Sequence, residues 1–413
     1  MKFLATFLLL ATVSTAAHAQ RTGPEVTSWI LNLTGKTGYH GISSNVQQVR
    51  YSADNVYVSC TCIPGYDIGP WAGNPNTPMN QNFVFKITRH PAQNTGTATA
   101  TPLGHIGIWT NGVSIFNAKD AHSYNNQNVW NQNAIIVEGS SFDACLGHPA
   151  PNGEYHHHLN PRCLYDDQDS SHHSPIIGFA FDGYPIYGAY GYRNTDGSGG
   201  VTRMRSSYRL RSLTQRNSLP GGGTLQQSQY GPDVSPQYPL GFYIEDFEFV
   251  QGFGDLDLHN GRFCVTPEYP NGTYAYFVTL DVDGNAAYPY ILGPTYYGVV
   301  SPGNTGPQSG HNTPAEQVTT YTGTSDVEAP VEAQDWNIYP NPATDIMTVQ
   351  APTTDGDWRI SISDLLGHDV ASMGTIAGGS ARTVSVAGLV SGVYLMHFES
   401  ATQTRTTRLV IAR

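Results

Sequence analysis

Many short segments of the chain alternate apolar and polar residues, and this alternation is the strongest constraint on its fold. The stretch 82–88, Asn-Phe-Val-Phe-Lys-Ile-Thr, is an example. A period of two places alternate side chains on opposite faces of a strand, while few segments repeat apolar residues at helical spacing. Frequent glycine (44), proline (27) and tyrosine (25) suit short strands joined by tight turns. The sequence therefore predicts a mainly β protein.

The first residues predict export. Residues 1–19 combine a lysine next to the initial methionine, a short apolar run and a small-residue Ala-His-Ala end. This pattern is typical of a secretory signal peptide, with Gln20 as the first mature residue. The apolar run is shorter than the roughly 20 residues of a membrane span. Because no later segment is long and apolar enough, we expect a secreted protein with no transmembrane span.

The net charge of the chain limits the kinds of partner that it can bind. The formal charge of −12 disfavours nucleic acid, because phosphate binding requires lysine and arginine. A divalent cation or an extracellular polymer or glycan remains compatible with this charge.

The rest of the chain divides into three parts. Residues 20–301 are long enough to form a large β-rich domain with its own core. Residues 302–333 are rich in Gly, Pro, Ser, Thr and Gln without periodicity, and predict a flexible linker. Residues 334–413 contain several alternating segments separated by turns, which favour a small Ig-like β-sandwich.

The C-terminal part carries four motifs in order. They are Asn-Ile-Tyr-Pro-Asn-Pro-Ala at 337–343, Asp-Leu-Leu-Gly at 364–367, Ser-Gly-Val-Tyr at 391–394 and Thr-Arg-Leu-Val at 407–410. Residues 334–413 thus resemble the type A sorting domain of type IX secretion. The resemblance implies a Bacteroidetes-type bacterium and the type IX secretion machinery as a partner. It also implies an extracellular or outer-membrane-surface location.

The large domain carries Asp-x-Cys-x-Gly-His-Pro at 143–149, Tyr-His-His-His at 155–158, and further characteristic segments at 173–183, 260–262 and 266–276. With these motifs it resembles the YHYH family, named for Tyr-His-Tyr-His. His157 stands where the family has its second tyrosine. The family implies an exported β-rich domain and indicates no particular activity.

The histidines near this motif predict a metal site. On a strand, His156 and His158 project to one face and His157 to the other. His148 lies shortly before them, and turns between these residues allow the three to meet. Three such ligands with one open position build a catalytic zinc, and copper also favours imidazole. The alternative is a structural cluster in which the histidines bond to one another and to nearby carboxylates.

Other residues are candidates for catalysis. His173 or Asp182 could supply a fourth ligand or a general base, and Glu268 is a second candidate acid. Asp182 is a lone acid among apolar residues, and a turn-forming Asp-Gly explains it as well as a functional role does.

Three further residues are candidates for substrate binding. Arg262 could hold an anionic substrate or simply pair with an acid. Tyr155 and Tyr187 could bind a glycan through their rings, or could be core residues with a satisfied hydroxyl.

Five cysteines allow at most two disulfides. Cys145 and Cys163 bracket the histidine strand, and a disulfide between them would clamp its ends. Either Cys60 or Cys62 could pair with Cys264. The acidic stretches 166–169 and 281–285 offer oxygens for calcium, although acidic surface turns explain both more simply.

Three functions follow from these features. The leading hypothesis is an extracellular metal-dependent hydrolase of a polymer or ester. The second is a metal-free polysaccharide lyase, in which a His or Tyr abstracts a proton and Arg262 neutralises the uronate carboxylate. The third is a non-catalytic surface module that binds metal or glycan.

Overall fold

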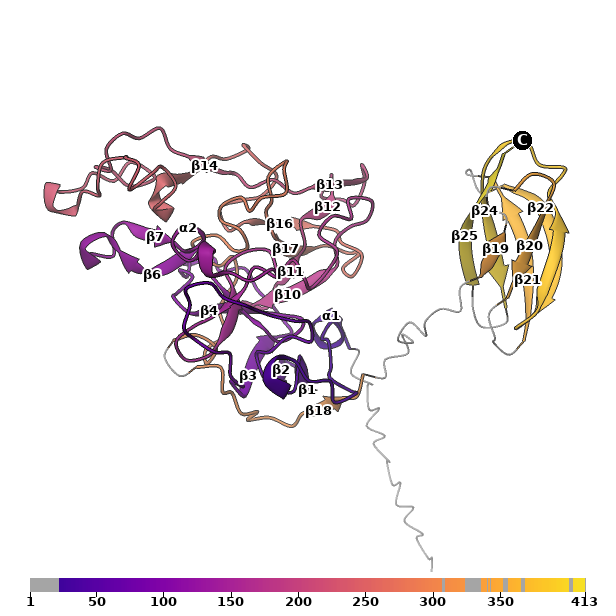
Figure 1. Cartoon of the computed structure of the whole chain (residues 1–413), viewed down its shortest axis with the longest axis horizontal. Helices are drawn as coiled ribbons and strands as arrows, with labels where there is room; N and C mark the ends of the chain where they lie inside the picture. Colours follow the sequence, from indigo (N-terminus) through magenta and orange to yellow (C-terminus); the bar gives the residue numbers. More distant parts are fainter. Residues whose placement is uncertain are drawn as a thin grey trace, which may run out of the picture. The chain divides into compact units, whose positions relative to one another are not determined.

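The computed structural model describes residues 22–306, 309–323, 336–339, 341, 343–351, 356–364, 368–400 and 404–412. The chain divides after Gly323 into two compact units, which are described separately (Figure 1). Strands dominate both units, so the prediction of a mainly β protein is confirmed. The expected signal peptide, residues 1–19, lies outside the described residues.

The first unit contains two short α-helices and eighteen strands in its described residues. The helices are α1 (Pro24–Thr27) and α2 (Ala134–Val137), and 3-10 turns occupy Tyr39–Gly41, Tyr124–Asn126, Gly139–Ser141, Gln227–Gln229 and Ile244–Asp246. The strands are β1 (Val46–Tyr51), β2 (Asn55–Cys60), β3 (Phe83–Thr88), β4 (His105–Trp109), β5 (Ser114–Phe116), β6 (Lys119–Ser123), β7 (Asn131–Asn133), β8 (His148–Pro149), β9 (Tyr155–His157), β10 (Ile176–Ala180), β11 (Pro185–Tyr187), β12 (Tyr190–Tyr192), β13 (Val201–Arg203), β14 (Tyr208–Leu210), β15 (Phe247–Phe249), β16 (Gly261–Cys264), β17 (Thr273–Phe277) and β18 (Thr319–Tyr321).

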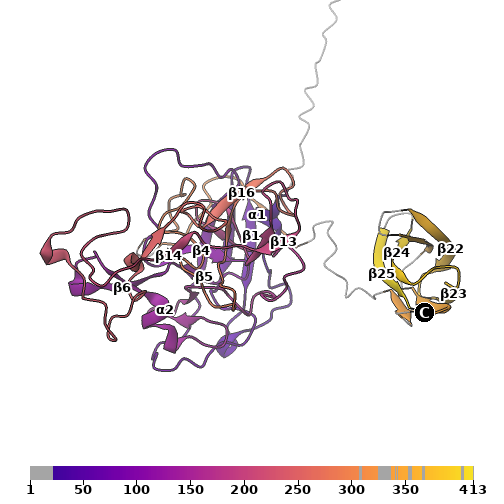
Figure 2. The ribbon, with the colours of Figure 1, turned by 90° about the horizontal axis from the view of Figure 1, so that it is seen from above.

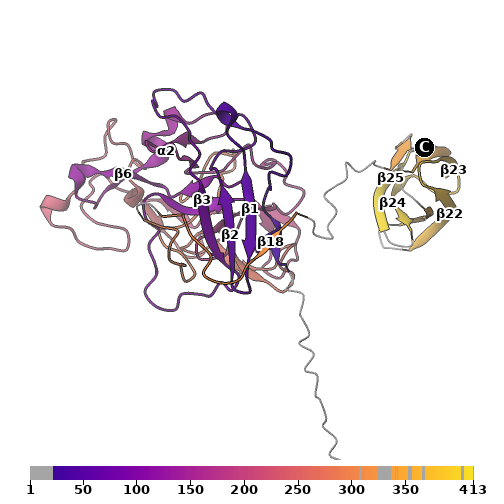
Figure 3. The same cartoon turned by 90° about the horizontal axis from the view of Figure 1, so that it is seen from below.

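A four-stranded antiparallel sheet in the order β18-β1-β2-β3 forms one side of this unit (Figure 3). The strand β18 of this sheet lies within the segment that was expected to be a linker. The sequence assigned residues 302–333 to a flexible linker, but β18 pairs with β1 through Val49–Tyr321 and two further pairs. Asn304 is also fully buried, and its side chain bonds to both backbone groups of Lys86. The described part of this Gly- and Pro-rich segment is therefore irregular chain that packs on the sheet up to Gly323, and residues 324–333 of the expected linker lie outside the described residues.

An eight-stranded mixed sheet in the order β16-β17-β11-β10-β4-β5-β9-β8 forms the centre of the unit. Every residue of β4, β10 and β17 is buried, because both faces of these strands are covered. Phe179 of β10 packs into the core shared with the four-stranded sheet, and its neighbour Ala180 packs into a second core on the opposite face. In Figure 2, β4 and β5 lie in the middle of the unit. The strands β9 and β8 form one edge of this sheet.

Smaller two-stranded sheets surround the central one: β6-β7, β12-β13 and β14-β15. The β6-β7 hairpin and the segment carrying β14 project together from one side of the unit (Figure 1). A small core of Trp130, Leu225 and Tyr243 holds them to each other.

The second unit is a two-sheet sandwich. One sheet has the order β19-β20-β23 and the other β22-β21-β24-β25. Trp358, Met396 and Leu409 belong to the core between them. The bounds are β19 (Asn337–Tyr339), β20 (Ile346–Gln350), β21 (Asp357–Ser363), β22 (Asp369–Ala377), β23 (Ala381–Ser385), β24 (Gly392–Glu399) and β25 (Thr404–Ile411). Within the described parts of both units, no helix has the length and hydropathy that crossing a membrane requires.

Candidate metal centre

The hairpin of β8 and β9 brings the first two histidines together. In its antiparallel register His148 lies directly opposite His156, and residues paired in this way have neighbouring side chains. The connecting turn runs from Ala150 to Gly153, whose amide donates to the Ala150 carbonyl. Gly153 has φ of +80°, and a Cβ there would lie 2.9 Å from the Thr77 carbonyl oxygen, so glycine is needed. The Cys145–Cys163 disulfide then joins the segments that flank the hairpin, and the predicted pairing is present in the structure.

Four side chains converge at this sheet edge: Glu138, His148, His156 and His158. Nε2 of His156 lies 3.1 Å from Nε2 of His148 and 3.1 Å from Nε2 of His158. Oε2 of Glu138 lies 3.0 Å from Nε2 of His158 and 3.5 Å from Nε2 of His148. All four atoms fall within 4.8 Å of one another. Ligands about 2.0–2.1 Å from a tetrahedral metal would be separated by about 3.3 Å, which matches this spacing.

The other ring nitrogens determine where the protons are. Nδ1 of His156 contacts the Glu154 carbonyl oxygen at 3.0 Å, and Nδ1 of His158 contacts the Asn117 carbonyl oxygen at 2.6 Å. A carbonyl only accepts, so each Nδ1 must carry the hydrogen and each neutral ring has a bare Nε2.

His148 follows the same rule. Its Nδ1 lies 2.8 Å from Oγ of Ser141, and that hydroxyl donates its hydrogen to the Glu138 carbonyl at 2.8 Å. The hydroxyl therefore accepts from His148, which leaves a third bare Nε2. Three lone pairs facing one point without a hydrogen between them is the arrangement of metal ligands whose outer nitrogens are fixed by backbone and hydroxyl groups.

Glu138 supplies the only carboxylate of the cluster. It caps the C-terminal end of α2, and its buried Oε2 has no partner in regular hydrogen-bond geometry among the described residues. Burial alone would raise the pKa of Glu138, but when the rings of His148 and His158 are protonated, their hydrogen bonds and positive charges outweigh it and hold this pKa well below its usual range. Burial and the two neighbouring imidazoles lower the pKa of His156 well below its usual value. The cluster therefore presents one anionic oxygen and a neutral central imidazole.

The cluster forms the floor of an open cleft of about 480 Å³. The three histidines are nearly buried, with side chains at most 6% exposed where they meet Glu138, whereas the Glu138 side chain is 29% exposed. Glu138 is thus on the solvent side of the cluster. Lys119, Asp120 and Ser140 also line the cleft, together with the apolar side chain of Phe116, which stacks on His156 at 3.8 Å.

Comparison with known families agrees with this layout. Residues 84–288 match the family described as YHYH protein, and residues 337–412 match the secretion system C-terminal sorting domain. The chain is a YHYH-domain protein with a sorting domain. The sorting domain makes it a client of the type IX secretion machinery, delivered to the cell surface or the extracellular space. A search of curated proteins finds no match to the chain.

The YHYH domain places the other predicted catalytic residues elsewhere. His173 precedes β10, donates through Nδ1 to the Ser174 carbonyl, and packs on the rings of Tyr187, Tyr192 and Phe277. Its strand is separated from β9 by β4 and β5. His173 is therefore not part of the group of possible ligands, in which Glu138 is the fourth residue.

Asp182 is also not among the residues that line the cleft. It is fully buried in the turn between β10 and β11, and it accepts hydrogen bonds from the Tyr276 hydroxyl at 2.6 Å and from the Gly298 amide at 2.8 Å. Burial raises the pKa of Asp182 to about 6, and these hydrogen bonds oppose the rise. Glu268 accepts a hydrogen bond from the Tyr187 hydroxyl at 2.9 Å. Both carboxylates serve internal networks.

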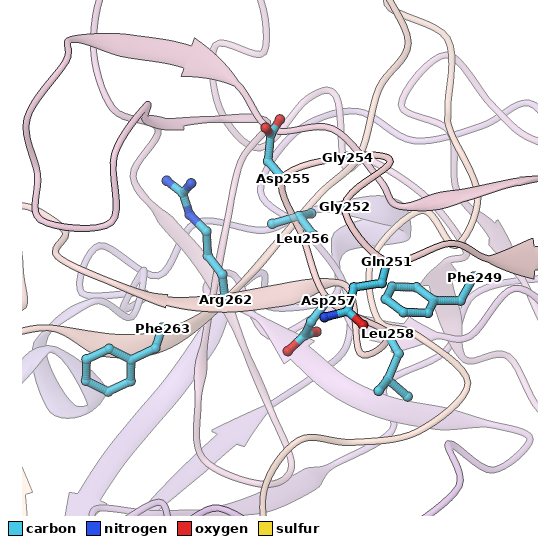
Figure 4. A pocket seen from close by; sticks show the side chains of 10 residues that line it. All are labelled: Phe249, Gln251, Gly252, Gly254, Asp255, Leu256, Asp257, Leu258, Arg262 and Phe263. Atoms are coloured by element: carbon cyan, nitrogen blue, oxygen red, sulfur yellow. The ribbon is translucent and has the colours of Figure 1, made fainter.

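The predicted substrate-binding residues do not line the cleft either. Tyr155 and Tyr187 are fully buried, and the Tyr155 hydroxyl donates to Asp143 at 2.9 Å. Arg262 lines a separate pocket with Asp255, Asp257 and neighbouring residues (Figure 4). Its guanidinium donates to the carbonyls of Tyr192 and Arg193. These three residues therefore serve in packing and in hydrogen bonds within the domain, and not in the cleft.

The remaining cysteines are unpaired. Cys60, Cys62 and Cys264 are all buried free thiols, so the expected second disulfide to Cys264 is wrong for this structure. The thiol of Cys62 donates to the Tyr155 carbonyl at 3.1 Å. Burial raises the pKa of Cys60 to about 12, which keeps this thiol protonated and inert.

The two candidate calcium stretches form ordinary turns. In the first, Asp167 accepts from the Asn160 amide at 2.7 Å. In the second, Asp281 accepts from the backbone amides of Asp283 and Asn285 at 2.9 and 2.8 Å. The Asp281 bonds are typical of an Asx turn, and the Asp167 bond joins two side chains.

Sequence reasoning missed Glu138 and Asp120. Glu138 is an isolated acid after the apolar run of α2. This helix packs on β6 and β7, and Glu138 at its end places a carboxylate oxygen within 3.5 Å of both His148 and His158. Asp120 lies in β6 and interacts with Glu138; burial, aided by that neighbouring charge, raises its pKa. No sequence spacing connects either acid to the histidines.

Proposed function

We propose that the YHYH domain is an extracellular metal-dependent hydrolase of a polymer or ester, with His148, His156 and His158 as the nitrogen ligands. The observation that supports this most strongly is the set of three bare Nε2 atoms facing one another. Without a cation these lone pairs repel, and each Nδ1 is already committed. The donor set of three imidazoles and one carboxylate suits zinc or copper, and it differs from the all-oxygen sets that calcium prefers.

Glu138 completes the donor set from the cleft side. As the most exposed of the four groups, it is the one that an entering water or substrate oxygen could displace or bond to. A bound zinc would supply a water whose pKa is lowered to about 7. In this proposal Glu138 orients that water, and the three histidines keep the site rigid.

Asp120 and Lys119 are the polar groups that a substrate in the cleft would meet first. Asp120 lies beside Glu138, close enough to exchange a proton with a group held there. Lys119 precedes it on β6 and offers a positive charge to an anionic substrate. The open cleft of about 480 Å³ suits a chain segment or an ester side group better than an enclosed small molecule.

The test separates metal binding from turnover. Purified full-length protein is stripped with a chelator, reloaded with zinc or copper, and analysed for metal content and for hydrolysis of chromogenic esters and neutral and anionic polysaccharides. We expect about one metal per chain, and hydrolysis in the reloaded form well above that of the chelated form. Asp120→Asn should keep the metal and lose most activity, while His156→Ala should lose both. Metal content well below one per chain under every condition would end the proposal.

A non-catalytic metal-binding module is the second candidate, and the deep burial of the three histidines favours it. It predicts full metal occupancy with no turnover that depends on the metal, and the same activity in Asp120→Asn as in wild type. The metal-free lyase receives no such support, because Arg262 and Tyr187 lie outside the cleft. A lyase would give unsaturated products that absorb in the ultraviolet, whereas a hydrolase would not, so the absorbance of the products separates the two.

A further inference from the structure

A second constellation of reactive side chains lies next to the candidate metal centre. Nε2 of His105 is 2.9 Å from Oγ of Ser309, and Nδ1 of His105 is 2.9 Å from Oε1 of Glu154. These residues come from β4, from the segment after residue 306 and from the start of β9. A hydroxyl, an imidazole and a carboxylate joined in this order have the connectivity of a nucleophile, a general base and its orienting acid.

The carboxylate is held firmly in place. Glu154 is 4% exposed, its amide donates to Oδ1 of Asn152 at 3.2 Å, and its Oε2 accepts from Nδ2 of Asn152 at 3.4 Å. Its Oε1 can only accept when ionised, so Nδ1 of His105 carries a hydrogen and Nε2 of the neutral ring is free to accept from Ser309. The tautomer is therefore the one that a general base requires.

The imidazole is equally fixed. His105 is 8% exposed, and its ring meets Phe83, Phe85 and Phe181 edge-on at centroid distances of 5.3, 5.1 and 5.9 Å. These aromatic contacts leave only the Ser309 side of the ring open. Ser309 is partly exposed, and its single hydroxyl hydrogen can go to the Gly306 carbonyl at 2.7 Å, to the Asn304 carbonyl at 3.1 Å or to Nε2 of His105 at 2.9 Å; the nucleophile requires the rotamer that donates to His105.

The three residues line one pocket of about 460 Å³. Phe83 and the 47% exposed Leu103 give it an apolar side, while Gln81, Asn152 and His311 give it amide and imidazole groups. Apart from Glu154, which is bound to His105, the lining carries no carboxylate. This combination suits the acyl group of a neutral ester better than a charged polymer.

We propose that Ser309, His105 and Glu154 form a serine esterase site that transfers the acyl group of a small neutral ester to water. Oγ of Ser309 attacks the carbonyl carbon while His105 takes the hydroxyl proton on Nε2. The bond to the leaving alcohol breaks as His105 returns that proton to the alcohol oxygen, which leaves an acyl-serine. Water then loses a proton to His105 and attacks the acyl carbon, and the proton returns to Ser309 as the carboxylic acid departs.

The site differs from another grouping of the same residue types. Ser171, His172 and Asp169 are exposed and lie close together, but the Ser171 hydroxyl and the Asp169 carboxylate both contact Nδ1 of His172. One nitrogen cannot take the serine proton and donate to the carboxylate at once. Ser171 is therefore a matched negative control for Ser309.

The direct test is labelling of the full-length protein with a fluorophosphonate probe, followed by peptide mass spectrometry. We expect one adduct, on Ser309, formed equally in metal-loaded and chelated protein. Ser309→Ala should abolish labelling and lower 4-nitrophenyl acetate hydrolysis by more than about 10³-fold, whereas Ser171→Ala should leave both unchanged. The adduct is mapped on the wild-type protein, so this measurement identifies the nucleophile even if a variant fails to fold.

Absence of any adduct, or an adduct at a residue other than Ser309, would overturn the assignment. Labelling that disappears on chelation would also overturn it, because this chemistry uses no metal. Glu154→Gln supplies a finer test: it keeps the shape and the backbone carbonyl bonded to His156, so metal content should stay at the wild-type level while labelling slows by at least about tenfold. Failure of the metal proposal leaves all these outcomes unchanged.

Discussion

Removing the central imidazole of the metal cluster gives the sharpest test of the geometry. Nε2 of His156 is 3.1 Å from Nε2 of both His148 and His158. His156→Ala therefore deletes the proposed ligand nitrogen that lies between the other two. A four-ligand structural zinc site is worth about 10–16 kcal/mol, and one ligand is then worth roughly 2.5–4 kcal/mol. At about 1.4 kcal/mol per tenfold, the Kd should rise about 10²–10³-fold.

The weaker metal binding of His156→Ala should also reduce the thermal stabilisation that the metal provides. Metal at about 1,000 times Kd stabilises the folded state by about 4 kcal/mol, and a Kd weakened about 10²–10³-fold reduces this to about 1 kcal/mol or less. At roughly 2–4 °C per kcal/mol, chelation should lower the Tm of the wild type by about 8–16 °C and that of His156→Ala by only a few degrees. Competition with a chromogenic chelator and calorimetry with and without chelator measure both quantities.

His157→Ala is the matched control. His157 is on the same strand, fully buried, and faces the opposite side of the sheet. Its truncation should lower the Tm through lost packing, by the same amount with and without metal, and leave Kd within about threefold of wild type. The reasoning fails if His156→Ala binds zinc or copper as tightly as wild type, or if chelation leaves the wild-type Tm unchanged.

Three further predictions concern the scaffold of the first unit. Replacing Cys145 and Cys163 by serine opens a link across 18 residues and should cost about 3 kcal/mol of unfolding free energy, measured with urea. Asp182 has a folded pKa of about 6 against 3.8, so the folded state holds the proton more tightly; this stability is complete below about pH 4 and is lost as pH rises through about 6. Asp182→Asn should therefore remove a pH-dependent fall of at most about 3 kcal/mol over that window, in calorimetry at a series of pH values. Arg216→Met leaves the fully buried carboxylate of Asp246 unpaired and should destabilise by about 3–5 kcal/mol, whereas an unchanged urea midpoint would contradict the role of this ion pair.

The sequence allowed some parts of the site to be predicted. The alternation of strand side chains correctly placed His156 and His158 on one face and His157 on the other, and the turn residues between His148 and His156 allowed a hairpin. These are local consequences of strand geometry. The pairing of Cys145 with Cys163 follows from the same hairpin, because it brings the flanking segments together.

The fourth donor could not be predicted in this way. Glu138 reaches the histidines from the end of α2, which packs on β6 and β7, and this tertiary contact leaves no local pattern in the sequence. His173 and Asp182 were plausible substitutes by sequence distance, but strand order places β4 and β5 between β10 and the histidine strand. Asp182 is instead bound by the Gly298 amide, 116 residues away, which no spacing rule anticipates.

The groups that position the three imidazoles are independent of any cation. His148 and His156 are held opposite each other by strand register, and the outer nitrogens are held by the carbonyls of Glu154 and Asn117 and the hydroxyl of Ser141. The disulfide closes the base of the hairpin. If the cluster is the metal site that we propose, its donors are therefore held in place before a cation binds. The lone-pair repulsion that the fold imposes on the empty site then becomes part of the driving force for binding, because the cation relieves it.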